Sequence, residues 1–208
     1  SSLLTGLVAM SAHLPAILFG LYAGVLSDRF NRFHLMVFAH ASQAITVMIV
    51  PIVLFYGIKH IMLLGLLAFI RNSFGTLFPP AFNAFVAENF SKNKLVKVNS
   101  LLTSSGYLAF LLGPALAGIL LGILTLRDLF IFDALSFLIA MLLLLMITLP
   151  RSVSKKKKSH ATIQDLLSGF GYLRKHPAIG YLLALTTINN LFIMGPAIVG
   201  MPILVKTH

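Results

Sequence analysis

Two ionisable side chains of this chain lie inside long apolar stretches. Arg71 is the sole charged residue between positions 61 and 87, and Asp133 is the sole one between 129 and 149. An arginine at the centre of a bilayer costs about 2.5–3.5 kcal/mol, so Arg71 must face a partner or a wet cavity rather than lipid. A buried structural salt bridge is one interpretation of Arg71. For Asp133 three remain open: it binds a proton, pairs with Arg71 or caps a helix at the membrane surface.

A second group of charges forms a short polar segment, Gly-Val-Leu-Ser-Asp-Arg-Phe-Asn-Arg at positions 24–32, between two apolar runs. Gly24 allows neighbouring helices to approach closely. Asp28, near a helix end, can accept backbone N–H groups or pair with an arginine. A simple turn closed by a salt bridge is the plainest interpretation of this segment.

The residue types exclude several kinds of site. The chain has no Cys, and its seven His residues form no cluster with metal-ligand spacing, so we expect no metal site and no disulfide. A phosphate-binding loop of the Walker type is absent from the sequence, so we expect no bound nucleotide and no other cofactor.

The composition indicates the elements that must position these residues. Hydrophobic residues make up 58% of the chain and charged residues only 10%, against about a quarter in soluble domains. A membrane-spanning helix needs about 20 apolar residues. We therefore predict an all-α integral membrane protein with about six spanning helices, at 3–26, 35–56, 61–87, 98–123, 129–149 and 178–205.

The net charge is +11, and most of the basic residues lie in the loops between these spans. We therefore interpret the charge as a signal of membrane topology and expect no nucleic-acid partner. Of the 16 Lys and Arg residues, twelve lie at 28–34, 88–97 and 150–177, and three lie in or near the alternate loops. Cytoplasmic loops are enriched in Lys and Arg. We therefore predict a multi-pass protein of the cell membrane with residue 1 outside and those three loops in the cytoplasm.

The polar segment resembles the signature loop of the major facilitator superfamily of secondary transporters. The matching residues are Gly24, Leu26, Asp28, Arg29 and Arg32. The segment departs from the family pattern at Asn31, where Gly is usual, and at Phe33, where a basic residue is usual. In the family this loop is a cytoplasmic gate, and the carboxylate corresponding to Asp28 is thought to latch the two halves of the transporter.

Two further motifs follow in the family's order. Arg71 and Gly75 form an R-x-x-x-G element, in which Phe74 replaces the usual Gln. A helix-packing element described for proton-driven exporters has its counterpart in Gly106, Gly113, Pro114 and Gly118, with Ala117 in place of a Gly. The segments Pro79–Phe82 and Phe132–Phe137 also resemble the exporter branch that includes enterobactin and macrolide efflux proteins.

The resemblance implies a partial facilitator fold that covers about family helices 2 to 7. Residues 1–149 would then form the amino-terminal half without its first helix, and 150–177 would form the central cytoplasmic loop with an amphipathic helix at 162–175. Residues 178–208 would begin the carboxy-terminal half. We expect the first family helix and the remainder of the transporter to be missing from this chain.

The implied function is secondary active transport, as a proton-coupled exporter of a hydrophobic small molecule of the drug or siderophore class. Arg71 and Asp133 would serve transport and coupling, and the partners would be the lipid bilayer, the substrate, protons and the rest of the transporter. An enzyme is not expected, because a membrane enzyme would need clustered acids or His near one membrane face. The alternative is a non-transporting membrane sensor or assembly protein built on a facilitator half.

Overall fold

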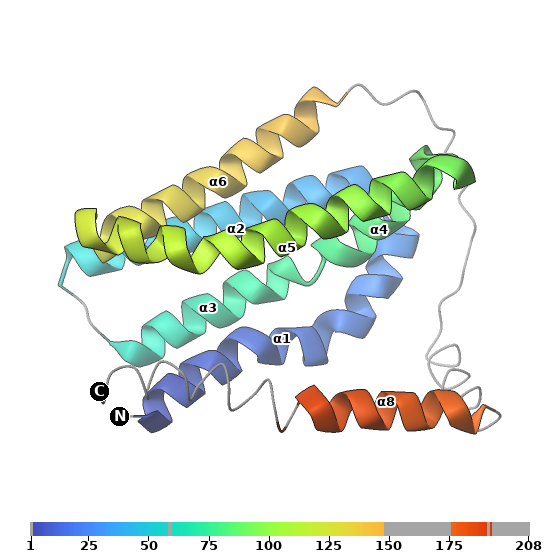
Figure 1. Ribbon diagram of the computed structural model, residues 1–208. Helices are drawn as coiled ribbons and strands as arrows, with labels where there is room; N and C mark the ends of the chain where they lie inside the picture. Colours follow the sequence, from blue (N-terminus) through green and yellow to red (C-terminus); the bar gives the residue numbers. More distant parts are fainter. Residues whose placement is uncertain (1, 58–59, 148–175, 191, 193–208) are drawn as a thin grey trace. The chain divides into compact units, whose positions relative to one another are not determined.

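The computed structural model describes residues 2–57, 60–147, 176–190 and 192 (Figure 1). All regular elements in these ranges are helices, which confirms the predicted all-α class. They are α1 (Ser2–Arg29), α2 (Arg32–Phe55), α3 (Ile61–Gly75), α4 (Phe78–Asn89), α5 (Lys92–Ile123), α6 (Leu126–Met146) and α8 (Pro177–Asn189). Five segments are long and apolar enough to cross a bilayer, with α3 and α4 together forming one of them. The chain is a multi-pass membrane protein.

The last predicted span, 178–205, begins with α8, and most of its second half lies outside the described residues. The predicted cytoplasmic segment at 150–177, with its Lys run and amphipathic helix, also lies almost entirely outside them. The chain divides into two compact units: Ser11–Lys157 in one, and Ser1–Met10 with Lys158–His208 in the other. The residues proposed from the sequence all belong to the first unit.

The predicted span at 61–87 is present as one span, but it consists of two helices. Helix α3 ends at Gly75, and α4 begins at Phe78 with Pro79 and Pro80 in its first turn. Neither proline has an amide hydrogen, and each ring crowds the carbonyl four residues earlier. Two adjacent prolines break the helix here, whereas α1, α2 and α5 each continue through a single proline. The last turn tightens instead, with Leu77 N donating to Phe74 O at 3.1 Å.

Three helix starts differ by at least three residues from the sequence prediction, and α2 is the first, because it begins at Arg32 after its N-cap Asn31 rather than at 35. Helix α5 begins at Lys92 rather than at 98, so most of the predicted loop at 88–97 is helical. Lys side chains are compatible with a helical turn that extends beyond the hydrocarbon region. Helix α6 begins at Leu126 rather than at 129, because Thr125 and Asp128 form a reciprocal capping box that starts it earlier.

Helix α2 forms the centre of the larger unit and packs against α6, α3 and α4 (Figure 1). Its buried residues recur every three or four positions and therefore form a stripe along the helix. They are Met36, Ala39, Gln43, Ala44, Thr46, Val47, Val50 and Pro51. Small side chains at such contacts allow membrane helices to approach one another closely. Helices α3 and α6 therefore both lie next to α2.

Candidate functional site

Arg71 of α3 and Asp133 of α6 form an ion pair. Nη2 of Arg71 lies 3.8 Å from Oδ2 of Asp133, and the two side chains are 34% and 41% exposed. The guanidinium carbon also lies 5.1 Å from the ring centroid of Phe137, which follows Asp133 by about one turn of α6. One helix thus supplies both a carboxylate and an aromatic ring to the same arginine, which are the two kinds of group that lower the cost of a charge in a membrane.

The start of α6 excludes one of the three interpretations of Asp133, the helix cap. The N-cap of the helix is Thr125, and the carboxylate of Asp128 in the first turn accepts from the Thr125 amide at 3.0 Å and from its hydroxyl at 2.5 Å. Asp133 follows Leu126 by seven residues, about two helical turns. It is therefore not the cap, and the geometry places it as the partner of Arg71.

A histidine that the sequence analysis did not single out lies beside this pair. The His40 ring of α2 is 4.6 Å from the ring centroid of Phe78 and 5.9 Å from that of Phe137. Its Nδ1 atom is buried, as is Nε of Arg71, and neither has a hydrogen-bond partner among the described residues. The available signal was spacing, because His40 falls four residues after Met36 and three before Gln43, on the stripe that α2 buries.

Gly75 has a specific packing role next to the charged pair. A Cβ atom at this position would lie 3.1 Å from Oε1 of Gln43. Gln43 is buried and donates from Nε2 to the Ala39 carbonyl at 3.2 Å, so it has little freedom to move. The glycine of the R-x-x-x-G element therefore permits close contact between α3 and α2, and Gln43 acts as a helix-packing residue at this point.

Most of the polar segment at 24–32 is helical: residues 24–29 form the last turns of α1, and only Phe30 and Asn31 lie between α1 and α2. Asn31 is the N-cap of α2, and its side-chain oxygen accepts from the amides of Phe33 at 2.9 Å and His34 at 3.3 Å. Asn is a strong N-cap residue, whereas Gly offers no side-chain acceptor. The departure from the family pattern at Asn31 thus has a local physical reason.

Arg32 connects this turn to the end of α4. It forms ion pairs with Asp28, at 3.8 Å, and with Glu88, and it donates to the Ser27 carbonyl at 3.4 Å and the Ala84 carbonyl at 3.5 Å. Glu88 was not selected from the sequence. Its signal was its position as an acid at the end of a span, followed along the chain by Lys92, Lys94 and Lys97.

The other predicted gate residues are arranged more simply. Arg29 ends α1 and is exposed. The Gly24 carbonyl accepts from the Ser27 hydroxyl at 2.8 Å. A Cβ at Gly24 would meet no atom within 4 Å, so the predicted close helix approach is not made by the described residues.

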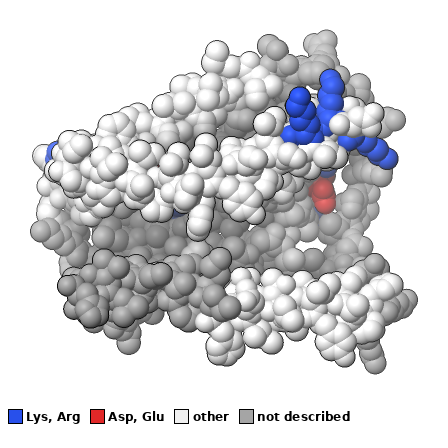
Figure 2. Space-filling view, in the orientation of Figure 1, with Lys and Arg blue, Asp and Glu red and all other residues white. Residues whose placement is uncertain are grey.

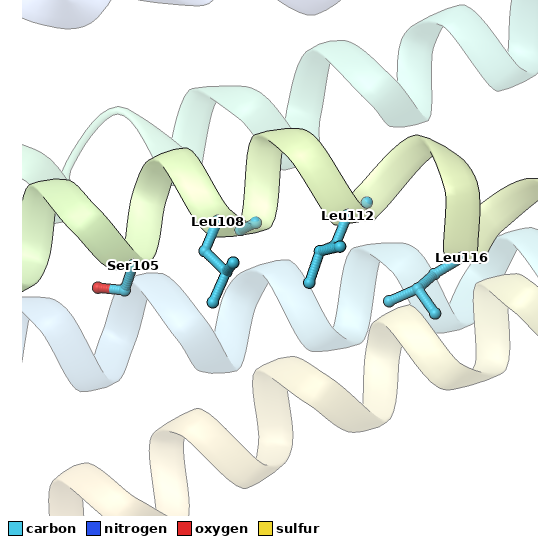
Figure 3. Close-up of a pocket in the computed structure, with 6 residues that line it drawn as sticks. Ser105, Leu108, Leu112 and Leu116 are labelled. Atoms are coloured by element: carbon cyan, nitrogen blue, oxygen red, sulfur yellow. The ribbon is translucent and has the colours of Figure 1, made fainter.

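The glycine and proline element lies on α5, which continues through Pro114. No residue of α5 is buried against the described part of the chain, and a Cβ at Gly106, Gly113 or Gly118 would meet nothing within 4 Å there. An open apolar depression of about 350 Å³ runs along one side of the helix, where Ser105, Leu108, Leu112 and Leu116 project together (Figure 3). The predicted packing role of these glycines is therefore not fulfilled within the described residues.

An open apolar cleft of about 220 Å³ separates α1 from α3. It is lined by Phe19, Tyr22, Ala23, Leu26, Ser73, Phe74 and Leu77. Arg71 is directed toward α6, whereas Ser73 and Phe74 face α1. Helix α3 thus has a charged side and an aromatic, apolar side.

Positive charge gathers where α4 meets α5. Figure 2 shows Lys and Arg side chains clustered at this end of the larger unit, beside acidic surface. Lys92, Lys94 and Lys97 are exposed on the first two turns of α5. Arg32 reaches Glu88 at the same end.

The family model and the curated relatives indicate the same family. The family model for the Major Facilitator Superfamily matches residues 1–208. Macrolide efflux protein A of Enterococcus faecalis is 27% identical over 183 residues, which cover 87% of this chain and 56% of the relative. Macrolide efflux protein A of Streptococcus pyogenes is 26% identical over 190 residues, covering 90% of this chain and 47% of the relative.

An uncharacterised MFS-type transporter of Bacillus subtilis (strain 168), YfiS, is 27% identical over 181 residues, covering 83% of this chain and 41% of the relative. The chain thus spans about half the length of the curated relatives it matches. No solved structure gives a significant match.

Proposed function

Because the chain belongs to the major facilitator superfamily, we propose that it forms part of a secondary transporter that exports a hydrophobic small molecule in exchange for protons. The observation that carries this proposal is the ion pair between Arg71 and Asp133, formed by two membrane-spanning helices. Ionisable residues within spans are costly, and they commonly mark proton and substrate pathways.

The proposed coupling step is protonation of Asp133. A bound proton removes the negative charge that offsets Arg71, because a neutral carboxyl group no longer forms an ion pair. The guanidinium must then find other acceptors or a wetter environment. Alternating access rocks one part of the bundle against another, so loss of this contact between α3 and α6 would favour one arrangement over the other.

The proposed substrate class follows from the cleft between α1 and α3. Three aromatic rings, Phe19, Tyr22 and Phe74, line it together with aliphatic side chains, a surface suited to apolar drugs or siderophores. Two of the relatives are named as macrolide efflux proteins, which supports export as the direction.

The proposed topology places residue 1 outside and the loops near 28–34, 88–97 and 150–177 in the cytoplasm of a cell-membrane protein. Residues 1–149 would belong to the amino-terminal half, 150–177 to the central loop and 178–208 to the start of the second half. Gly24, Asp28, Arg29 and Arg32 would form the cytoplasmic gate. The element at Gly106, Gly113, Pro114 and Gly118 would pack against parts of the transporter other than the described residues.

The function is tested in inside-out vesicles containing the full-length protein. An imposed gradient, acidic inside, should drive uptake of a hydrophobic fluorescent dye, and a protonophore should abolish it. Vesicles without the protein provide the baseline. Dye accumulation that follows a sodium gradient and ignores the pH gradient would contradict proton coupling.

Topology is tested separately with single cysteines, since the chain has none of its own. Cysteines at Ser91 and Ser159 should react with an impermeant maleimide only from the cytoplasmic side, and one at Lys59 only from outside. External labelling at Ser159 would overturn the assignment of helices to family positions.

A further inference from the structure

We propose that His40 is the proton-carrying residue between Asp133 and the cytoplasmic end of the bundle. This inference rests on the proposed function, because it names the group that receives the coupling proton from Asp133. Its basis is the cluster formed by His40, Phe78, Phe137, Arg71 and Asp133, contributed by four helices.

The positions of the contacting residues along α4 and α6 indicate on which side of the ion pair His40 lies. Phe137 follows Asp133 by one turn of α6, and Phe78 follows Arg71 by seven residues toward the end of α4. His40 contacts both of these rings. In the proposed topology α4 and α6 run toward the cytoplasm, so His40 lies on the cytoplasmic side of the Arg71–Asp133 pair.

The imidazole is chemically suited to this role. A neutral imidazole has one nitrogen with a lone pair, and its usual titration range spans physiological pH. Nδ1 of His40 is buried without a hydrogen-bond partner among the described residues. The flanking rings, at 4.6 and 5.9 Å, can stabilise the ring once it becomes a cation.

The proton step is balanced. His40 reaches the pair only through Phe137, so the proposed transfer runs through intervening water: the O–H bond of protonated Asp133 breaks and an N–H bond forms on His40, which leaves a carboxylate and an imidazolium. The carboxylate pairs again with Arg71, and the imidazolium releases its proton toward the cytoplasm.

The charged pair nearest to His40 is reached through Phe137, whose ring contacts both His40 and Arg71. Arg71 of α3 opposes a second cation, and Asp133 of α6 favours one. On α4, Phe78 is the side chain in contact with His40, and the nearest charged residue of that helix is Glu88. On α2 itself, His34 and Arg32 lie six and eight positions away, near the start of the helix.

The first arm of the test measures proton binding without transport. Full-length protein with isotope-labelled histidine is titrated by NMR, and the His40 resonance is assigned by its loss in His40→Gln. Its midpoint should move to higher pH by about one unit in Arg71→Gln and to lower pH in Asp133→Asn. His34→Gln should leave it unchanged. A midpoint that neither substitution moves would overturn the proposal.

The second arm measures transport. His40→Phe keeps an aromatic ring but cannot bind a proton, and His40→Gln is polar but cannot titrate. We expect both to fold, to lose at least tenfold of dye uptake driven by the pH gradient, and to lose its pH dependence between about pH 5 and 8. A wild-type pH profile in His40→Phe would overturn the proposal. If wild-type protein ignores the pH gradient while the NMR midpoints still shift as expected, the proposed function fails and His40 remains coupled to the pair.

Discussion

Arg32 and Arg71 each form ion pairs with acidic residues, but their surroundings differ. Arg32, at the end of the bundle, is surrounded by two carboxylates and two backbone carbonyls. Arg71, within a span, has one carboxylate at 3.8 Å and one aromatic ring, and its buried Nε has no partner among the described residues. A guanidinium has five N–H donors, so Arg32 is far closer to full hydrogen bonding than Arg71.

This difference indicates different tasks. A charged group with several partners keeps most of its interactions when one is lost, so it suits a fixed connection between the α1–α2 turn and α4. An arginine with a single carboxylate depends on the charge state of that one acid. The contact at Arg71 can therefore be switched by one proton, whereas the contacts of Arg32 are redundant.

The largest expected effect is at Arg71. Arg71→Ala should abolish dye uptake driven by the pH gradient, because no cation remains to pair with Asp133. Arg71→Lys should insert and fold but lose most of this transport, since lysine lacks the planar donor fork and can lose its proton. Uptake in vesicles is measured together with protein level.

Arg127→Ala is the matched control for this experiment. Arg127 lies 3.9 Å from Asp128 of its own helix, near the start of α6, so its loss should leave transport close to wild type. Normal transport by Arg71→Ala at wild-type protein level would remove Arg71 from the mechanism.

A smaller effect is expected at Asp28. Asp28→Asn removes the proposed latch carboxylate, but Arg32 keeps Glu88 and its two carbonyl partners, so the fold should persist. Transport should fall several-fold while the amount of folded protein, measured by size-exclusion chromatography, stays near normal. A parallel loss of folded protein and transport would instead support a purely structural turn.

The link from Arg32 to Glu88 should contribute little to stability. Glu88 is 57% exposed, and exposed ion pairs typically contribute about 0.2–1 kcal/mol. Thermal unfolding of Glu88→Gln, Arg32→Gln and the double variant should give a coupling energy within that range. A coupling above about 3 kcal/mol would show that this contact is not redundant.

The smallest effect is expected for Asn31→Gly. Asn31→Gly restores the usual family residue and should lower stability by only a few tenths of a kcal/mol, whereas Asn31→Ala should cost about 1 kcal/mol. The same thermal assay compares the two. Equal destabilisation by both would mean that the hydrogen bonds to Phe33 and His34 are not what stabilises this turn.

Local features were predictable because they depend on one segment at a time. The spanning segments follow from apolar length, and the need to shield Arg71 follows from the cost of a charge in lipid. The break after Gly75 was also encoded locally, by Pro79 and Pro80, although a prediction based on apolar length alone passed over it. The capping box at Thr125 and Asp128 likewise shows how a short-range signal moves a helix start by three residues.

The pairing of charges was decided by the tertiary structure. The chain has five acidic residues, and the sequence left open whether Asp133 was a cap, a proton site or the partner of Arg71. Which acid lies near a given arginine depends on which helices are neighbours and on the rotation of each helix about its axis. Packing of α2 against α3, α4 and α6 sets both, and it brings His40 and Phe137 to the same site. The sequence by itself determined that Arg71 must be compensated, because that cost belongs to a single helix. Only the packing of several helices determined that Asp133 and Phe137 compensate it.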